Sequence, residues 1–124
     1  MLDVPMSLGD VLDRITILEI KAARVQDPSR RANVGKELAL LQARWSAAGL
    51  GQPPQKSALR AVNEALWDVE EQLRRQERDQ DFGAEFVRLA RSVYQLNDQR
   101  AAIKRALNLE LGSALIEEKE YLRE

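Results

Sequence analysis

The sequence predicts an all-α protein, a small bundle of about four helices with a long C-terminal helix. Apolar residues recur every three or four positions in four successive segments of the 124-residue chain, which places them on one face of a helix. Only six Gly and four Pro interrupt these segments, and no strand pattern competes with them. A chain of this length suits one hydrophobic core, so we expect residues 1–124 to form a single helical domain.

The first helix is predicted to begin after Ser7, an N-cap residue by type, with Met6 and Val11 placed to form a hydrophobic staple. Pro28 ends this helix, since proline cannot continue it and restrains the residue before it. The intervening apolar residues follow at helical spacing: Leu8, Val11, Leu12, Ile15, Leu18, Ala22 and Val25.

Ile17 and Ile20 lie on the side of this helix away from its main stripe. A helix that is apolar on two faces is typical of one packed between two partners. The second partner is either another copy of the chain, which predicts a homodimer, or the long fourth helix of the same chain.

Pro28 can open the second helix, with Asp27 or Asn33 as its cap. This helix stops in the Gly- and Pro-rich loop at residues 49–54. Its stripe is Val34, Leu38, Leu41, Trp45 and Ala48. Ser57 is the predicted N-cap of the third helix, whose stripe is Leu59, Val62, Leu66, Val69 and Leu73. The polar run at residues 74–81 is either the solvated end of that helix or a turn.

The fourth helix is predicted to open near Asp81 and to run to about Leu122. Its weak point is Gly112-Ser113, where a kink or a break is expected.

The composition narrows the function classes. The chain has no Cys and no His, so thiolate chemistry, the commonest acid/base residue and the commonest metal ligand are all missing. The net charge of -1 does not favour nucleic-acid binding. No apolar run approaches the ~20 residues of a membrane-spanning helix, and the N-terminus lacks a signal pattern. We therefore expect a cytoplasmic protein with no cofactor, no metal and no nucleic-acid or membrane partner.

The fourth helix carries polar residues inside its apolar stripe. Two sets of residues occupy the positions that face a partner helix in a heptad seam: Phe86, Val93, Arg100 and Leu107, with Leu89, Leu96 and Ile103. Arg100 therefore falls in the middle of the stripe. The same flank carries three further polar residues: Asn97, Lys104 and Asn108. We call these three residues and Arg100 the polar seam.

A buried guanidinium needs a partner, because an unpaired charge away from water is very costly. Glu19, Glu37 and Glu70 stand beside apolar stripes and are the candidate partners. Three interpretations follow: a structural network that fixes helix register, a pocket that binds a small carboxylate or phosphate, or a solvent-facing stripe. The candidate ligand-binding residues are Asn97, Arg100, Lys104, Asn108 and Glu19.

A metal site has weaker support. Glu64, Asp68 and Glu71 lie within two helical turns. Helical carboxylate sites usually pair such a motif with a second one, often with His. No second motif exists, so this group is interpreted as a solvated charged face.

Several segments together resemble a family of small bacterial proteins known only as a domain of unknown function. The resemblance runs from about Val4 to Leu122 and rests on five groups of residues: 4–10, 15–21, 33–38, 97–105 and 112–121. The third of these is Asn33-Val34 with Lys36-Glu37-Leu38, and the last is Gly112-Ser113 with Glu117-Glu118-Lys119 and Tyr121. The resemblance implies that the residues of the polar seam are important, but it implies no activity.

Two functions are compatible with these observations. The first is a non-enzymatic helical bundle that self-associates, as a dimer or other homo-oligomer, or docks on another protein. The second is a protein that binds a small anionic metabolite, or a His-free enzyme, using the Arg, Lys and Asn side chains of the polar seam. Neither assigns catalytic residues.

Overall fold

The computed structural model describes residues 1–121 and contains four α-helices. These are α1 (Leu8–Arg24), α2 (Pro28–Ala47), α3 (Gln55–Arg78) and α4 (Ala84–Glu110). None of residues 1–121 lies in a β-strand. The predicted all-α bundle with a long C-terminal helix is therefore confirmed. Within the same range, no helix combines the length and the apolar character needed to cross a membrane.

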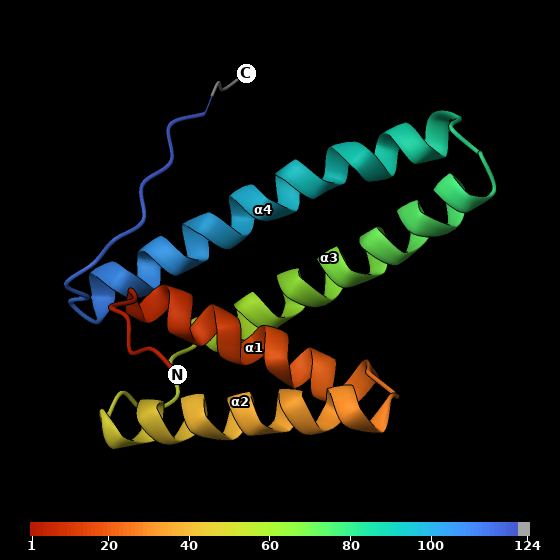
Figure 1. Cartoon of the computed structure of the whole chain (residues 1–124). Helices are drawn as coiled ribbons and strands as arrows, with labels where there is room; N and C mark the ends of the chain where they lie inside the picture. Colours follow the sequence, from red (N-terminus) through yellow and green to blue (C-terminus); the bar gives the residue numbers. More distant parts are fainter. Residues whose placement is uncertain (122–124) are drawn as a thin grey trace.

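The helix α1 lies at the centre of the bundle. The helices α3 and α4 form a long antiparallel hairpin, α1 packs across the base of this hairpin, and α2 packs on the other side of α1 (Figure 1). Every other helix therefore contacts α1.

This position explains why α1 is apolar on two sides. Ile20, on the side away from the main stripe, is only 2% exposed within the single chain. The second face of α1 is therefore covered, at Ile20, by the chain itself.

The core forms where α1 meets the other three helices. Buried residues from all four helices pack together: Leu12, Ile15, Trp45, Leu59 and Leu107. The indole nitrogen of Trp45 donates to the Gly51 carbonyl oxygen at 2.8 Å, which fixes the loop between α2 and α3. Burying these side chains supplies the main driving force for the fold.

The first two helices begin as predicted. The Ser7 side chain accepts a hydrogen bond from Asp10 N, and the Asp27 side chain accepts one from Arg30 N with Pro28 in the first turn. The third helix begins earlier than predicted, at Gln55. Ser57 lies inside its first turn and donates to the Pro54 carbonyl oxygen instead of capping.

The polar run after Leu73 is the solvated end of α3, which continues to Arg78. Gln80, at φ 54°, then ends the helix, and Asp81 N donates back to the Gln76 carbonyl oxygen at 2.9 Å. This is the left-handed cap that many helices use. The next helix, α4, opens at Ala84, close to the predicted Asp81.

The helix α4 breaks at Gly112 and does not continue beyond it. Gly112 has φ 65°, and Ser113 N donates to the Asn108 carbonyl oxygen at 2.8 Å, so glycine provides the left-handed C-terminal cap. Residues 113–121, which we call the tail, turn back alongside α4 without regular structure (Figure 1). The expected helical end at Leu122 lies outside the described residues.

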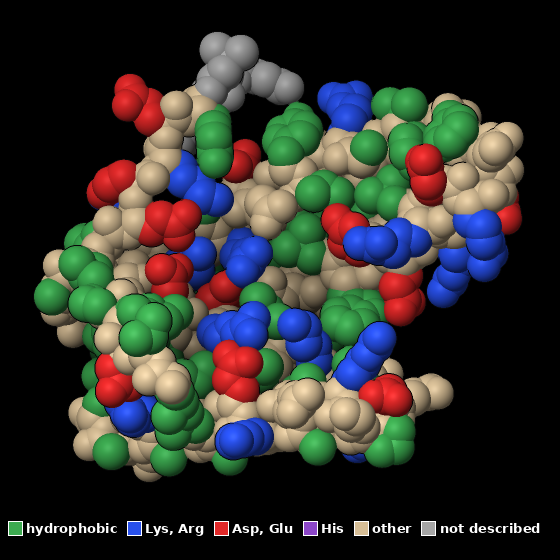
Figure 2. Space-filling model, in the orientation of Figure 1, with side chains coloured by type: hydrophobic (Ala, Val, Ile, Leu, Met, Phe, Trp, Pro, Cys, Tyr) green, Lys and Arg blue, Asp and Glu red, His purple; other side chains and the backbone are tan. Residues whose placement is uncertain are grey.

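The far part of the hairpin projects beyond α1 and α2 (Figure 1). We call residues 69–78 and 84–96 the arm. Five apolar residues of its stripe are only half-buried: Val69, Leu73, Phe86, Val93 and Leu96. Near the tip Phe82 is exposed, and on the arm itself Val87 is exposed. Apolar side chains are correspondingly visible over this part of the surface in Figure 2. A two-helix arm leaves part of its apolar stripe uncovered because no third helix packs on it.

Candidate functional site

The first turn of α1 lies against the end of α4. The N-cap Ser7 is buried, and its side-chain oxygen accepts a hydrogen bond from Asp10 N at 3.1 Å. Leu8 N donates to Ser113 Oγ, also at 3.1 Å. A helix leaves its first N–H groups without partners inside the helix. Side chains from both ends of the chain supply these partners, so α1 can begin inside the protein.

Gly9 is the point of closest approach between α1 and α4. Its N–H donates to Asn108 Oδ1 at 2.6 Å. A Cβ atom at this position would lie 2.8 Å from the Lys104 carbonyl oxygen and 3.0 Å from Asn108 Oδ1. Both distances are shorter than ordinary van der Waals contact. Only glycine therefore fits without moving the two helices apart.

The partner of Arg100 is Asp13, one helical turn further along α1. Arg100 Nε donates to Asp13 Oδ1 at 2.9 Å, and Arg100 Nη2 donates to Asp13 Oδ2 in the same bidentate pair. The Asp13 side chain is 6% exposed and that of Arg100 is 27% exposed. The hydrogen bonds to Asp13 outweigh the opposing effect of burial and raise the pKa of Arg100 above its usual value. Arg100 therefore stays charged beside Asp13.

Neutral side chains from α1 and α3 complete the surroundings of Asp13. Asn63 Nδ2 donates to Asp13 Oδ1 at 2.9 Å and to Thr16 Oγ1 at 3.0 Å. Thr16 Oγ1 donates to the Asp13 carbonyl oxygen at 2.8 Å. On α4, Arg100 Nη1 lies 3.5 Å from Asn97 Oδ1, a long hydrogen bond. Three helices thus meet around one buried carboxylate.

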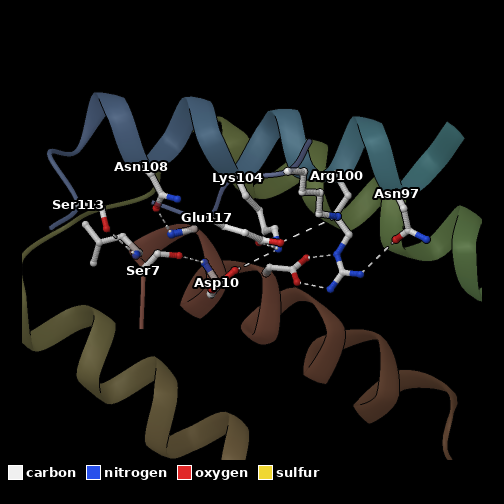
Figure 3. Close-up of polar contacts among 12 residues, drawn as sticks. Ser7, Asp10, Asn97, Arg100, Lys104, Asn108, Ser113 and Glu117 are labelled. Atoms are coloured by element: carbon white, nitrogen blue, oxygen red, sulfur yellow. Dashed lines mark hydrogen bonds and ion pairs between the residues drawn. The ribbon is translucent and has the colours of Figure 1, made fainter. Parts of the chain in front are cut away.

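Lys104 joins the start of α1 to the tail. Its Nζ lies 3.1 Å from Asp10 Oδ1 and 2.9 Å from Glu117 Oε2. Burial alone would lower the pKa of Lys104, but the hydrogen bonds to Glu117 and Asp10 outweigh it and raise the pKa. Figure 3 shows Arg100, Lys104 and Asn108 pointing from α4 toward α1, with Glu117 reaching Lys104 from the tail.

Four of the five predicted site residues therefore lie on one face of α4 against α1. They are Asn97, Arg100, Lys104 and Asn108 (Figure 3). Glu19 is placed elsewhere: its carboxylate faces Lys56 at 3.2 Å and Arg60 at 3.7 Å on α3. The polar side chains between α1 and α4 therefore form ion pairs and hydrogen bonds that cap the first N–H groups of α1.

The predicted partners of Arg100 are wrong. Glu19 pairs with α3, Glu37 forms a bidentate pair with Arg14, and Glu70 lies on α3 within 4.0 Å of Arg74. The true partner, Asp13, interrupts the apolar stripe of α1 between Leu12 and Ile15. An acidic residue within the apolar stripe of α1 was therefore the sequence signal that could have identified Asp13 as the partner of Arg100.

The carboxylates considered for a metal site face cations of the same chain. Asp68 pairs with Arg24 at 2.6 Å, and Glu64 pairs with Arg60 at 2.8 Å. Across residues 1–121, no group of three or more Asp or Glu side chains is arranged to hold a metal ion.

A groove lies where α1 and the hairpin diverge, beside the buried pair. Its volume is about 540 Å³. Its apolar lining comes from Ile17 and Ile20 of α1 and from Leu66 and Trp67 of α3. Its polar lining is mixed in charge: Asn63, Glu70, Glu71, Arg74 and Arg100. We call this feature the arm groove, because most of its residues belong to the base of the arm or lie next to it.

No curated protein and no solved structure matches this chain. One family model does match it, over residues 2–123, and that family is described as one of unknown function. The match takes in α1 to α4, the polar seam and the tail. Because it covers nearly the whole chain, this protein belongs to the DUF6165 family of unknown function.

Proposed function

We propose that this protein is a helical interaction module that self-associates as a homodimer through the arm groove. The observation that carries the proposal is an apolar groove, about 540 Å³ in volume, beside an arm in which most of the apolar stripe is only half-buried. Exposed apolar surface that is contiguous and rimmed by polar residues marks interaction sites.

The apolar lining of the groove supports a helical occupant. Ile17, Leu66 and Trp67 are half-buried and line it together. At the base of the arm, α1 supplies the third helix that covers the hairpin, and it ends at Arg24 beside Asp68. Helices from a second molecule could extend this cover along the arm.

The charges of the groove favour a second copy over a strongly charged partner. Glu70 and Glu71 lie in the same groove as Arg74 and Arg100. In a twofold interface each patch meets its own copy, so a patch that carries both signs can pair acidic with basic residues. The net charge of -1 adds no long-range repulsion between copies.

The alternative, an anion-binding pocket at the polar seam, has less support. Arg100 already faces Asp13, and Lys104 already faces Asp10 and Glu117. A free anion would have to compete with carboxylates held in place by the fold.

Light scattering at micromolar concentration tests the proposal. We expect the wild type to show twice the mass of one chain. Trp67→Lys places a charge in the groove and should give a monomer that keeps its helical circular dichroism spectrum. Leu40→Lys, an apolar-to-charged change at an exposed position on α2, is the matched control and should leave the dimer intact. A wild type that is monomeric at every concentration contradicts the proposal.

A charge exchange tests the twofold pairing itself. Glu70→Arg alone and Arg74→Glu alone should each weaken the dimer, because like charges then meet across the interface. The double variant restores opposite charges within one self-complementary patch and should dimerise again. If both single variants dimerise like the wild type, the interface does not include this groove.

A further inference from the structure

The tail is attached to the body of the protein in two different ways. Its first residues are fixed by hydrogen bonds of Ser113: Ser113 N donates to the Asn108 carbonyl oxygen, and Ser113 Oγ accepts from Leu8 N. Within the tail, Ser113 Oγ donates to the Leu115 carbonyl oxygen at 2.8 Å. Beyond Leu115, charges hold the tail to α4. Glu117 faces Lys104 at 2.9 Å, and Glu118 faces Arg105 at 2.5 Å.

Apolar packing contributes little to this second part. Leu115, Ile116 and Tyr121 are all exposed. The Glu118 side chain is 70% exposed and that of Glu117 is 39% exposed, so water reaches both carboxylates. Exposed ion pairs stabilise a structure only weakly and are screened by salt. The outer tail is therefore the kind of segment that opens without unfolding the rest of the protein.

Opening the tail would leave two neighbouring cations on α4. Lys104 is only 12% exposed and would keep Asp10 as its one partner. Arg105 would lose the carboxylate of Glu118, its partner in the described residues. The tail itself shows which chemistry fits this face, because two successive carboxylates on an extended segment reach these two successive cations.

We propose that the Lys104–Arg105 face of α4 is a docking site for an acidic, extended segment of a partner protein, and that the tail is its internal competitor. The partner segment would carry two adjacent carboxylates, as Glu117-Glu118 does. The site lies at the opposite end of α4 from the arm, so it does not depend on the proposed dimer.

A partner protein fits this site better than the tail of a second copy. Residues 113–115 are tied to their own chain by the contacts of Ser113. Glu118 follows this anchor by three residues, a span of at most about 11 Å when fully extended. So short a reach limits exchange of the two carboxylates between two copies.

Peptide binding to the full chain tests the proposal. The probe is a fluorescently labelled peptide with the sequence of residues 113–121, and the host is the Glu117→Gln/Glu118→Gln variant, whose own tail is released. We expect this variant to bind the peptide about tenfold more tightly than the wild type, because the internal competitor is removed. Added salt should weaken the binding.

Two controls make the test specific. A peptide with both Glu residues replaced by Gln should not bind. Adding Arg105→Gln to the host should reduce binding, whereas adding Arg91→Gln, at an exposed position elsewhere on α4, should not. The proposal is overturned if the tail variant binds no more tightly than the wild type, or if acidic and neutral peptides bind alike. A wild-type dimer that becomes monomeric in the tail variant would also overturn it, because the tail would then belong to the second copy.

Discussion

At the scale of single residues, Arg100 shows what sequence reasoning can and cannot locate. Its position in the heptad seam places it in an apolar stripe, and the cost of an unpaired buried charge requires a partner. The identity of that partner depends on how α1 crosses α4. Asp13 lies 87 positions away in the chain, and helical periodicity does not predict which turn of one helix meets which turn of another.

Breaking this pair should destabilise the protein. Arg100→Met leaves the Asp13 carboxylate, 6% exposed, without its cation. Removing one partner of a buried pair costs about 3–5 kcal/mol, and we expect the lower end because the Arg100 side chain is 27% exposed. Urea unfolding of wild type and variant, followed by circular dichroism, measures the difference.

Replacing both partners separates a structural pair from an anion site. Asp13→Leu combined with Arg100→Met removes both charges and should recover much of the lost stability. If Arg100 instead bound an anion, Arg100→Met would be neutral, and phosphate or citrate would raise the melting temperature of the wild type only. That second result would favour the binding function.

At the scale of helices, the end of α4 acts as the cap of α1. Leu8 N and Gly9 N both donate to side chains from the region where α4 ends, Ser113 and Asn108. The same region carries the glycine that ends α4, Gly112. The register of α4 against α1 is therefore fixed by hydrogen bonds as well as by apolar packing.

The close approach at Gly9 gives a prediction with a matched control. Gly9→Ala places a Cβ 2.8 Å from the Lys104 carbonyl oxygen, so the helices must move apart, at a cost of about 1–3 kcal/mol. Gly35, in α2, has nothing within 4 Å of the same atom. Gly35→Ala should therefore stabilise the protein by up to about 1 kcal/mol through helix propensity. Thermal melts that shift in the same direction for both variants would contradict this explanation.

Helix ends were predictable where the cap is local. Ser7 and Asp27 lie directly before the helices that they cap. The predicted cap at Ser7 is confirmed, and of the two candidates for α2 the cap is Asp27 and not Asn33. The cap expected at Ser57 is wrong because α3 already begins at Gln55, directly after Pro54. Gly112 was recognised as a weak point, but the tail beyond it retains helical sequence character and is held by Lys104 and Arg105. Those long-range contacts are not visible in a periodic pattern.

At the scale of the whole molecule, the two apolar faces of α1 predicted a central helix correctly but did not identify what covers it. Ile20 is buried by the chain itself, so this residue no longer argues for a second copy. The uncovered surface lies instead along the arm, where the apolar stripes of α3 and α4 extend past the end of α1. Helical periodicity does not predict this uncovered surface, because it does not show that the hairpin is longer than the helices packed on it.

This difference between centre and arm predicts the pattern of amide hydrogen exchange. Residues 8–24 of α1 contact every other helix, so their amides should exchange only when the whole protein unfolds. The arm has no third helix along most of its length and should open at lower free energy. If arms pair in a dimer, raising the protein concentration from well below to well above the dissociation constant of the dimer should slow exchange in residues 69–78 and 84–96. Exchange in α1 should respond much less.

The Trp67→Lys variant should lose the concentration dependence in the arm while keeping the protection of α1. Arm exchange that is equally fast at both concentrations in the wild type would mean that no second copy covers the arm.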